Sequence, residues 1–310
     1  MSHHYLDAVH QGKNDWWRYL FGVLVIVFCG FFFGSLFAAI AGIGLLALVN
    51  PDPTVMRNPD QLEPLLRDFL AASPLINFVV QNLPFIALML GIFLAVKLLH
   101  GRSFRSLISP MGQFSLSRFL TGYTLWFGLL GITLLVSYAL SPGDFQWTFD
   151  PMQWGMLLIA SLLLTPIQIA AEELFCRAYL MQGLGLLTRN RFVLVSLPSL
   201  LFALGHFSNP EMARGAVWMA LLYWSLGVFL ALLTLRDNRL ELALGIHAAQ
   251  NMFVLLVANT ADSVLKTPSI WTIKETGDPQ LSLIWLLAQG GLVYWLLFGR
   301  KSRRPVVDAE

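Results

Sequence analysis

The sequence predicts an all-α fold, a polytopic membrane helix bundle with about eight transmembrane helices. Hydrophobic residues make up 56% of the 310 residues and charged residues only 12%, whereas soluble proteins carry roughly 25% charged residues. The apolar residues form continuous blocks of the length, roughly 20 residues, that a helix needs to cross a bilayer. A membrane β-barrel would instead show short segments of alternating polarity. The same composition excludes a disordered chain.

Eight apolar segments are candidate spans. They are Tyr19–Val49, Leu75–Leu99, Phe119–Leu140, Trp154–Leu187, Phe192–Phe207, Ala216–Leu235, Leu240–Ala258 and Leu281–Gly299. The first and the fourth are longer than one straight crossing requires. Glycines between positions 30 and 44 can tilt or break the first span, and Pro166 can kink the fourth.

The distribution of basic residues predicts the orientation of these spans. Fourteen Lys and Arg fall on the same side as the N-terminus, five fall on the opposite side, and Arg177 lies within a span. Because loops rich in Lys and Arg stay in the cytoplasm, we expect both termini to be cytoplasmic. The expected location is the plasma (inner) membrane, as an integral multi-pass protein.

Three charged residues lie deep within the fourth span. The other sixteen of the eighteen Asp and Glu lie in loops, in tails or at span ends, so Glu172 and Glu173 stand out, with Arg177 one turn later. A charge at the bilayer centre costs about 2.5–3.5 kcal/mol on insertion scales. Glu173 and Arg177 share a helix face and can form a local ion pair, or the segment can lie at the interface. Neither explanation covers Glu172, which points about 100° away from Glu173.

Two later spans add further polar groups. His206 lies near the end of the fifth span, and His247 and Asn251 share one face of the seventh. A single intramembrane histidine often serves only in an interhelical hydrogen bond. Together with the fourth span, however, these groups predict a polar cavity. There Glu172 with His206 can activate a water as a general base, and His247 with Asn251 can stabilise an oxyanion.

Three ordered motifs resemble those of the CAAX protease and bacteriocin-processing (CPBP) family. This family is also called Abi and includes the type II CAAX prenyl endopeptidases. Residues Glu172–Arg177 match its EExxxR motif, Phe202–His206 its FxxxH motif and His247–Asn251 its HxxxN motif. The resemblance covers about Trp154 to Ala258. It implies an all-helical intramembrane endopeptidase that hydrolyses a peptide bond in a membrane-associated protein or peptide.

The resemblance also implies a role for each motif residue. By this resemblance, Glu172 stands at the position of the family's catalytic base, and His206 at that of the residue that helps to hold the attacking water. His247 and Asn251 stand at the positions of the pair that stabilises the oxyanion. Glu173 and Arg177 resemble a supporting pair that orients the site. In many relatives a glycine follows the motif arginine, whereas here Ala178 does. We expect this difference to affect only the packing around Arg177.

With this resemblance the chain divides into four expected regions. Residues 1–18 are a cytoplasmic N-terminal tail, and residues 19–153 contain about three N-terminal transmembrane helices. Residues 154–258 are a catalytic core of about four helices, and residues 259–310 comprise a loop, the last helix and a basic C-terminal tail.

The predicted depths of the two histidines in the membrane differ. In full crossings, His206 would lie near the outer end of its span and His247 nearer the inner end, unless the fifth helix is short or tilted.

A zinc-dependent mechanism is the main chemical alternative. Glu172, His206 and His247 can supply three ligands to Zn²⁺, with a water in the fourth position. The chain has no HExxH motif, and Cys29 and Cys176 do not form a paired metal spacing. We therefore expect a metal-free mechanism with no cofactor, and zinc remains the alternative.

Other functional classes are less consistent with the sequence. A rhomboid-like protease needs a GxSG serine, a presenilin-like protease needs two intramembrane aspartates, and the spans contain neither. A transport protein would be expected to show paired halves, which are not visible. A non-catalytic membrane or immunity protein is a further alternative. The expected partners are a peptide or membrane-protein substrate and membrane lipids, and no nucleic acid.

Overall fold

A computed structural model describes residues 4–50, 52–274 and 277–299. Six helical segments are long and apolar enough to cross a membrane: Trp16–Val49, Pro74–Leu99, Leu116–Leu140, Pro151–Leu187, Ala216–Asp237 and Pro279–Phe298. Two shorter apolar helices, Arg191–Leu204 and Glu241–Leu256, complete the set. The all-α, polytopic membrane bundle predicted from the sequence is confirmed. The basic tail after residue 299 lies outside the described residues.

Three of the six long segments contain a π-helical turn. The first consists of α1 (Trp16–Phe28), a π turn (Cys29–Phe33) and α2 (Gly34–Val49). The second consists of α5 (Pro74–Leu94) and a π turn at Ala95–Leu99. The fourth consists of α7 (Pro151–Glu173), a π turn at Leu174–Leu180 and α8 (Met181–Leu187). The remaining bundle helices are α6 (Leu116–Leu140), α9 (Arg191–Leu204), α10 (Ala216–Asp237), α11 (Glu241–Leu256) and α12 (Pro279–Phe298).

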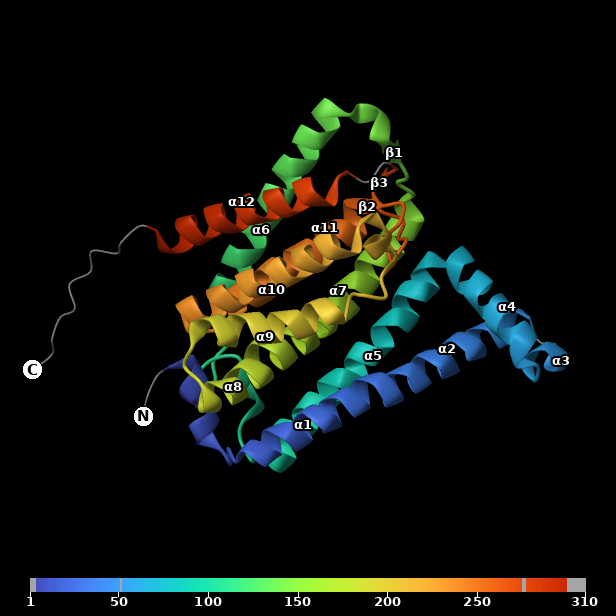
Figure 1. The fold of residues 1–310 in the computed structure, drawn as a ribbon. Helices are drawn as coiled ribbons and strands as arrows, with labels where there is room; N and C mark the ends of the chain where they lie inside the picture. The colour runs from blue at the N-terminus through green and yellow to red at the C-terminus, as the bar shows by residue number, and fades with distance from the viewer. Residues whose placement is uncertain (1–3, 51, 275–276, 300–310) are drawn as a thin grey trace, which may run out of the picture.

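Helix α11 forms the centre of the bundle (Figure 1). Thirteen of its sixteen residues are buried, and it contacts α6, α7 and α10. The approach to α6 is very close: a Cβ added to Gly245 would lie 2.1 Å from the Phe119 carbonyl oxygen, and one added to Gly122 would lie 2.6 Å from that of Leu242. Small residues at such contacts let membrane helices pack backbone against backbone. Helix α11 is therefore held by protein on several sides although it is short.

The two ends of the bundle are capped differently. The start of α1 and the end of α12 lie at the same end (Figure 1). At the opposite end, β1 (Phe145–Trp147) pairs antiparallel with β3 (Trp271–Ile273), and β2 (Ala258–Thr260) pairs parallel with β3. The short helices α3 (Pro53–Met56) and α4 (Pro59–Ala72) project from this opposite end.

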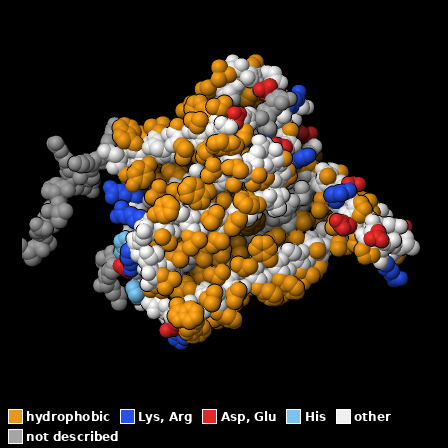
Figure 2. Space-filling model, in the orientation of Figure 1, with side chains coloured by type: hydrophobic (Ala, Val, Ile, Leu, Met, Phe, Trp, Pro, Cys, Tyr) orange, Lys and Arg blue, Asp and Glu red, His pale blue; other side chains and the backbone are white. Residues whose placement is uncertain are grey.

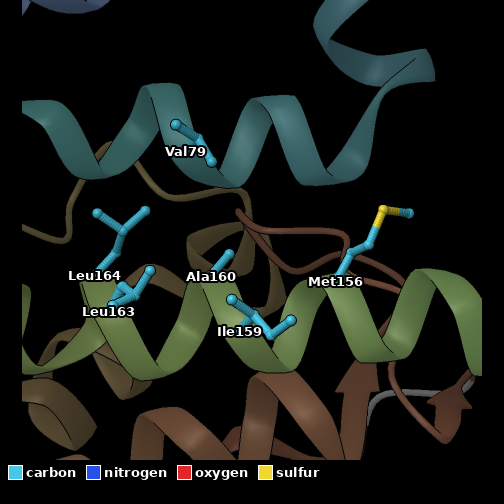
Figure 3. A pocket seen from close by; sticks show the side chains of 6 residues that line it. All are labelled: Val79, Met156, Ile159, Ala160, Leu163 and Leu164. Carbon is cyan, nitrogen blue, oxygen red and sulfur yellow. The ribbon is translucent and has the colours of Figure 1, made fainter.

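The surface pattern agrees with a membrane protein. Figure 2 shows hydrophobic side chains across the broad face of the bundle and charged side chains toward its two ends. Between α5 and α7 this apolar surface has a hollow of about 350 Å³, lined by Val79, Met156, Ile159, Ala160, Leu163 and Leu164 (Figure 3). Because its lining is wholly aliphatic, the hollow suits hydrocarbon and contains no group for chemistry.

The segment before α1 packs against the bundle. Residues Tyr5–Gln11 form a 3-10 helix in which Tyr5, Leu6, Ala8 and Val9 are buried, and the Tyr5 hydroxyl donates to the Leu107 carbonyl at 2.6 Å. Two residues after this 3-10 helix, the Lys13 carbonyl oxygen lies 2.7 Å from His100 Nδ1. Since a carbonyl only accepts, Nδ1 carries the proton and Nε2 of neutral His100 accepts from the Tyr179 hydroxyl at 2.8 Å.

The close contact at Gly245 predicts a stability defect. Gly245→Ala should lower the free energy of unfolding by about 1–3 kcal/mol, because the added methyl forces α6 and α11 apart. Thermal unfolding in detergent measures the change. Gly128→Ala is the matched control, since nothing lies within 4 Å of a Cβ at Gly128. Equal stability of the two variants would contradict the packing described for α11.

His100 predicts a loss of stability in mild acid. Burial lowers the pKa of His100 below its ordinary value of 6.5, so the folded state disfavours the proton that the unfolded chain accepts. The contribution of neutral His100 is therefore present above pH 6.5 and is lost as the pH falls toward the lowered pKa. The midpoint of thermal unfolding between pH 8 and pH 5.5 should fall less steeply in His100→Gln than in wild type. The exposed His10 supplies the control His10→Gln, and an unchanged slope in His100→Gln would contradict the linkage.

Candidate active site

The fourth span places its charged residues where α7 changes into a π turn. Helix α7 ends at Glu173, and Arg177 lies in the following turn. Arg177 Nη1 donates to Glu173 Oε1 at 2.7 Å, and both side chains are fully buried. This is the i, i+4 contact that the spacing allows. π turns are rare and occur frequently at functional sites, and this one is not predicted by the spacing of the charged residues.

His247 of the central helix α11 connects the two glutamates. Its Nδ1 lies 2.8 Å from Glu173 Oε1, and its Nε2 lies 3.4 Å from Glu172 Oε2. The Glu173 carboxylate accepts from Arg177 and therefore also accepts from Nδ1, which must carry a proton. Glu173 thereby fixes the ring of His247 so that Nε2 faces Glu172.

Glu172 differs from its neighbour in having an open carboxylate. Its side chain is 13% exposed, whereas that of Glu173 is fully buried. Its Oε2 is buried and has no hydrogen-bond partner among the described residues, since 3.4 Å to His247 Nε2 is too long for a good hydrogen bond. A carboxylate oxygen that lies beside an imidazole and makes no bond of its own is suited to holding a water molecule.

His206 approaches the same region from the end of α9. Helix α9 ends at Leu204, three residues before the end of the predicted fifth span, so His206 lies in the turn that follows. Its Nδ1 lies 2.8 Å from the Phe202 carbonyl oxygen, which makes Nδ1 the donor and leaves Nε2 as an acceptor. Its ring stacks on Tyr223 of α10 at 4.3 Å between centroids. No hydrogen bond or ion pair joins His206 and Glu172 within the described ranges.

Phe202 joins the three parts of the site. Its ring centre lies 4.6 Å from that of His206 and 5.8 Å from that of His247. The Arg177 guanidinium carbon lies 4.3 Å from the same ring. The depth problem posed by the two histidines is therefore solved by a short α9, which brings both rings against one phenylalanine. The FxxxH spacing contained this residue, but its packing role could not be predicted from the spacing.

Asn251 lies one turn beyond His247 on α11. It is half-buried, and within the described part of the chain its amide makes no hydrogen bond. The preceding Gln250 is already engaged, because its Oε1 accepts from Trp126 Nε1 at 2.9 Å. The Asn251 amide therefore remains able to bond to a ligand.

The proposed zinc ligands do not form a cluster in this structure. Among the described residues, no group of three His, Cys, Asp or Glu side chains has an arrangement that could hold a metal ion. Glu172 and His247 lie near each other, and no hydrogen bond or ion pair joins His206 to either of them among the described residues.

Comparisons with known proteins agree with the motifs. Residues 152–253 match the family described as Type II CAAX prenyl endopeptidase Rce1-like, and this range includes every candidate site residue. The chain is 32% identical over 300 residues to Uncharacterized protein YyaK of Bacillus subtilis (strain 168), covering 95% of this chain and 96% of that protein. No solved structure matches the chain. The chain belongs to the Rce1-like family of type II CAAX prenyl endopeptidases, an intramembrane protease family within the CPBP group that its motifs indicated.

Proposed function

We propose that this protein is a glutamate-type intramembrane endopeptidase that hydrolyses a peptide bond in a membrane-associated protein or peptide. The observation that carries the proposal is the difference between two adjacent carboxylates. Each carboxylate has a buried Oε2 without a hydrogen-bond partner among the described residues. Glu173 is fully buried and accepts from Arg177 and His247 through Oε1, whereas Glu172 is 13% exposed and lies 3.4 Å from His247 Nε2. The carboxylate of Glu173 thus holds Arg177 and His247 in place, and that of Glu172 is available to bind a water molecule.

In the proposed reaction Glu172 is the general base. It takes a proton from a water whose position His206 helps to fix through its free Nε2, and the water oxygen attacks the carbonyl carbon. The carbonyl oxygen becomes an oxyanion. When the C–N bond breaks, Glu172 returns the proton to the leaving amine nitrogen, which balances the hydrolysis.

The oxyanion is stabilised by His247 and Asn251 in this mechanism. With Nδ1–H committed to Glu173, His247 can donate from Nε2 only as an imidazolium, and the adjacent Glu173 carboxylate supports that charge. The free amide of Asn251 adds a second donor one helical turn away. Two such donors in a site shielded from water are worth several kcal/mol in the transition state, at about 2.7–4 kcal/mol each. No metal is needed for any of these steps.

One prediction from this mechanism concerns Glu172. Glu172→Gln should lower the rate of peptide cleavage by a factor of about 10²–10⁴ or more, because an amide cannot accept the proton of the attacking water. Purified protein in nanodiscs would be assayed with a library of quenched fluorescent peptides. Glu63→Gln, an exposed position in α4, is the matched control. A folded Glu172→Gln variant with wild-type activity would refute the assignment of the base.

The same assay tests the zinc alternative. Wild-type cleavage is expected to persist in a strong chelator, because the mechanism uses only protein side chains and water. Chelator-sensitive cleavage that Zn²⁺ restores would replace the metal-free mechanism with the metal-dependent one. A well-folded wild type that cleaves none of a library including prenylated and leader peptides would favour a non-catalytic role.

A further prediction concerns Glu173. Glu173→Gln should lower the free energy of unfolding by about 3–5 kcal/mol, because it leaves the Arg177 guanidinium buried without a counter-charge. Combining it with Arg177→Met removes that charge and should recover much of the thermal stability but not the activity, since His247 remains without its carboxylate partner. Thermal unfolding and cleavage would be measured on the same preparations. Full activity of the double variant would show that Glu173 has no part in positioning His247.

A further inference from the structure

Arg102 is a buried cation that has no counter-ion among the described residues. It lies in the loop that follows the second span, and only 3% of it is exposed. Its Nε, Nη1 and Nη2 atoms are all buried, and none has a hydrogen-bond partner among the described residues. Other shielded arginines of the chain pair with acids, as Arg177 does with Glu173 and Arg239 with Glu241. An uncompensated buried guanidinium is costly, so its surroundings indicate what can neutralise it.

The neighbours of Arg102 are aromatic hydroxyls rather than carboxylates. Tyr19, Tyr5 and Tyr179 lie close enough to act electrostatically on the guanidinium, and burial lowers its pKa. The Tyr5 and Tyr179 hydroxyls already bond to Leu107 and His100. The Tyr19 hydroxyl is buried without a partner. Arg102 and Tyr19 together therefore offer several unused donors in one place, an arrangement that suits an oxyanion.

The position of this cluster indicates which oxyanion it meets. Arg102 follows the span that ends at Leu99, and Tyr19 lies in the first turns of α1. Trp16 and Trp17 at the start of α1 are exposed, and tryptophans of this kind mark the level of the lipid headgroups. The cluster is thus at the depth of the lipid phosphates, at the end of the bundle where α1 begins (Figure 1).

The N-terminal segment covers the cluster. A Cβ added to Gly12 would lie 2.9 Å from Arg102 Cβ and 2.4 Å from the His100 carbonyl oxygen, so the chain at Gly12 lies directly on this loop. The buried Tyr5 approaches Arg102 from the same segment. A ligand would therefore enter beneath residues Tyr5–Gln11, and a bound ligand would connect this segment to α1 and the loop.

We propose that Arg102 and the Tyr19 hydroxyl form a binding site for a phosphate group. The planar guanidinium can donate two parallel hydrogen bonds to phosphate oxygens, the Tyr19 hydroxyl can donate a third, and the phosphate charge neutralises Arg102. The phosphate belongs either to a lipid headgroup or to free inorganic phosphate. The site is separate from the candidate active site and does not depend on the proposed function.

Ligand-dependent thermal stability tests the site. Full-length protein would be exchanged into neutral detergent until phosphorus analysis finds no further loss of bound phospholipid. One arm adds inorganic phosphate, against sodium chloride of equal ionic strength. The other adds phosphatidylglycerol, against diacylglycerol, which has no phosphate. A ligand at a hundredfold excess over its Kd should raise the unfolding midpoint of wild type by several degrees, about 3–5 °C, and the arm that responds identifies the source.

The variants make the test specific for Arg102. Arg102→Met should unfold at a higher temperature than wild type without ligand, because an uncompensated charge is removed, and it should lose the ligand response and any retained phosphorus. Arg105→Met, at an exposed position of the same loop, should keep the response. Tyr19→Phe, which removes one hydroxyl, should weaken it several-fold and serves if Arg102→Met fails to fold. Equal responses in wild type, Arg102→Met and Tyr19→Phe, or no response and no retained phosphorus in wild type, would overturn the site.

Discussion

A single buried carboxylate, that of Glu173, determines how the core of this protein is arranged. Its Oε1 accepts from both Arg177 Nη1 and His247 Nδ1, and no part of the side chain is exposed. In an apolar interior a charge must be paired, because no bulk water is present to solvate it. The requirement ties the end of α7 to α11 across the bundle. It also sets the ring orientation of His247, whose Nε2 lies 3.4 Å from Glu172 Oε2.

The sequence predicts those parts of the site that depend on spacing along one helix. The separation of Glu173 and Arg177 allowed their pair, and the absence of a helical partner for Glu172 indicated a different role for it. The contact between Glu173 and His247 joins residues 74 positions apart, and no periodicity within a segment reports it. Phe202 shows the same limit, since its motif gave its place in the chain but not the three groups around its ring. The role of each site residue in catalysis remains a prediction.

The fold shows a similar division. Hydropathy measures how well a segment transfers into lipid, and all eight apolar segments are helical, six of them long enough to span a membrane. Hydropathy does not report lateral packing, so it could not show that α11 lies at the centre. The backbone contact through Gly245 and Gly122 places it there, and protein rather than lipid surrounds most of its residues. The helices α3 and α4, the small sheet and the packed N-terminal segment lie in polar connections, where the hydropathy signal is weak.

The adjacency of Glu172 and Glu173 has a physical reason in this arrangement. Successive helical residues point about 100° apart, so the carboxylate of Glu173 is fully buried while that of Glu172 remains partly exposed beside His247. The inner carboxylate is fully buried and accepts from two donors through Oε1, and its Oε2 has no hydrogen-bond partner among the described residues. The outer one is partly exposed, with an oxygen that no described donor satisfies. In the proposed mechanism this carboxylate holds the water molecule, which is the reactant that peptide hydrolysis requires.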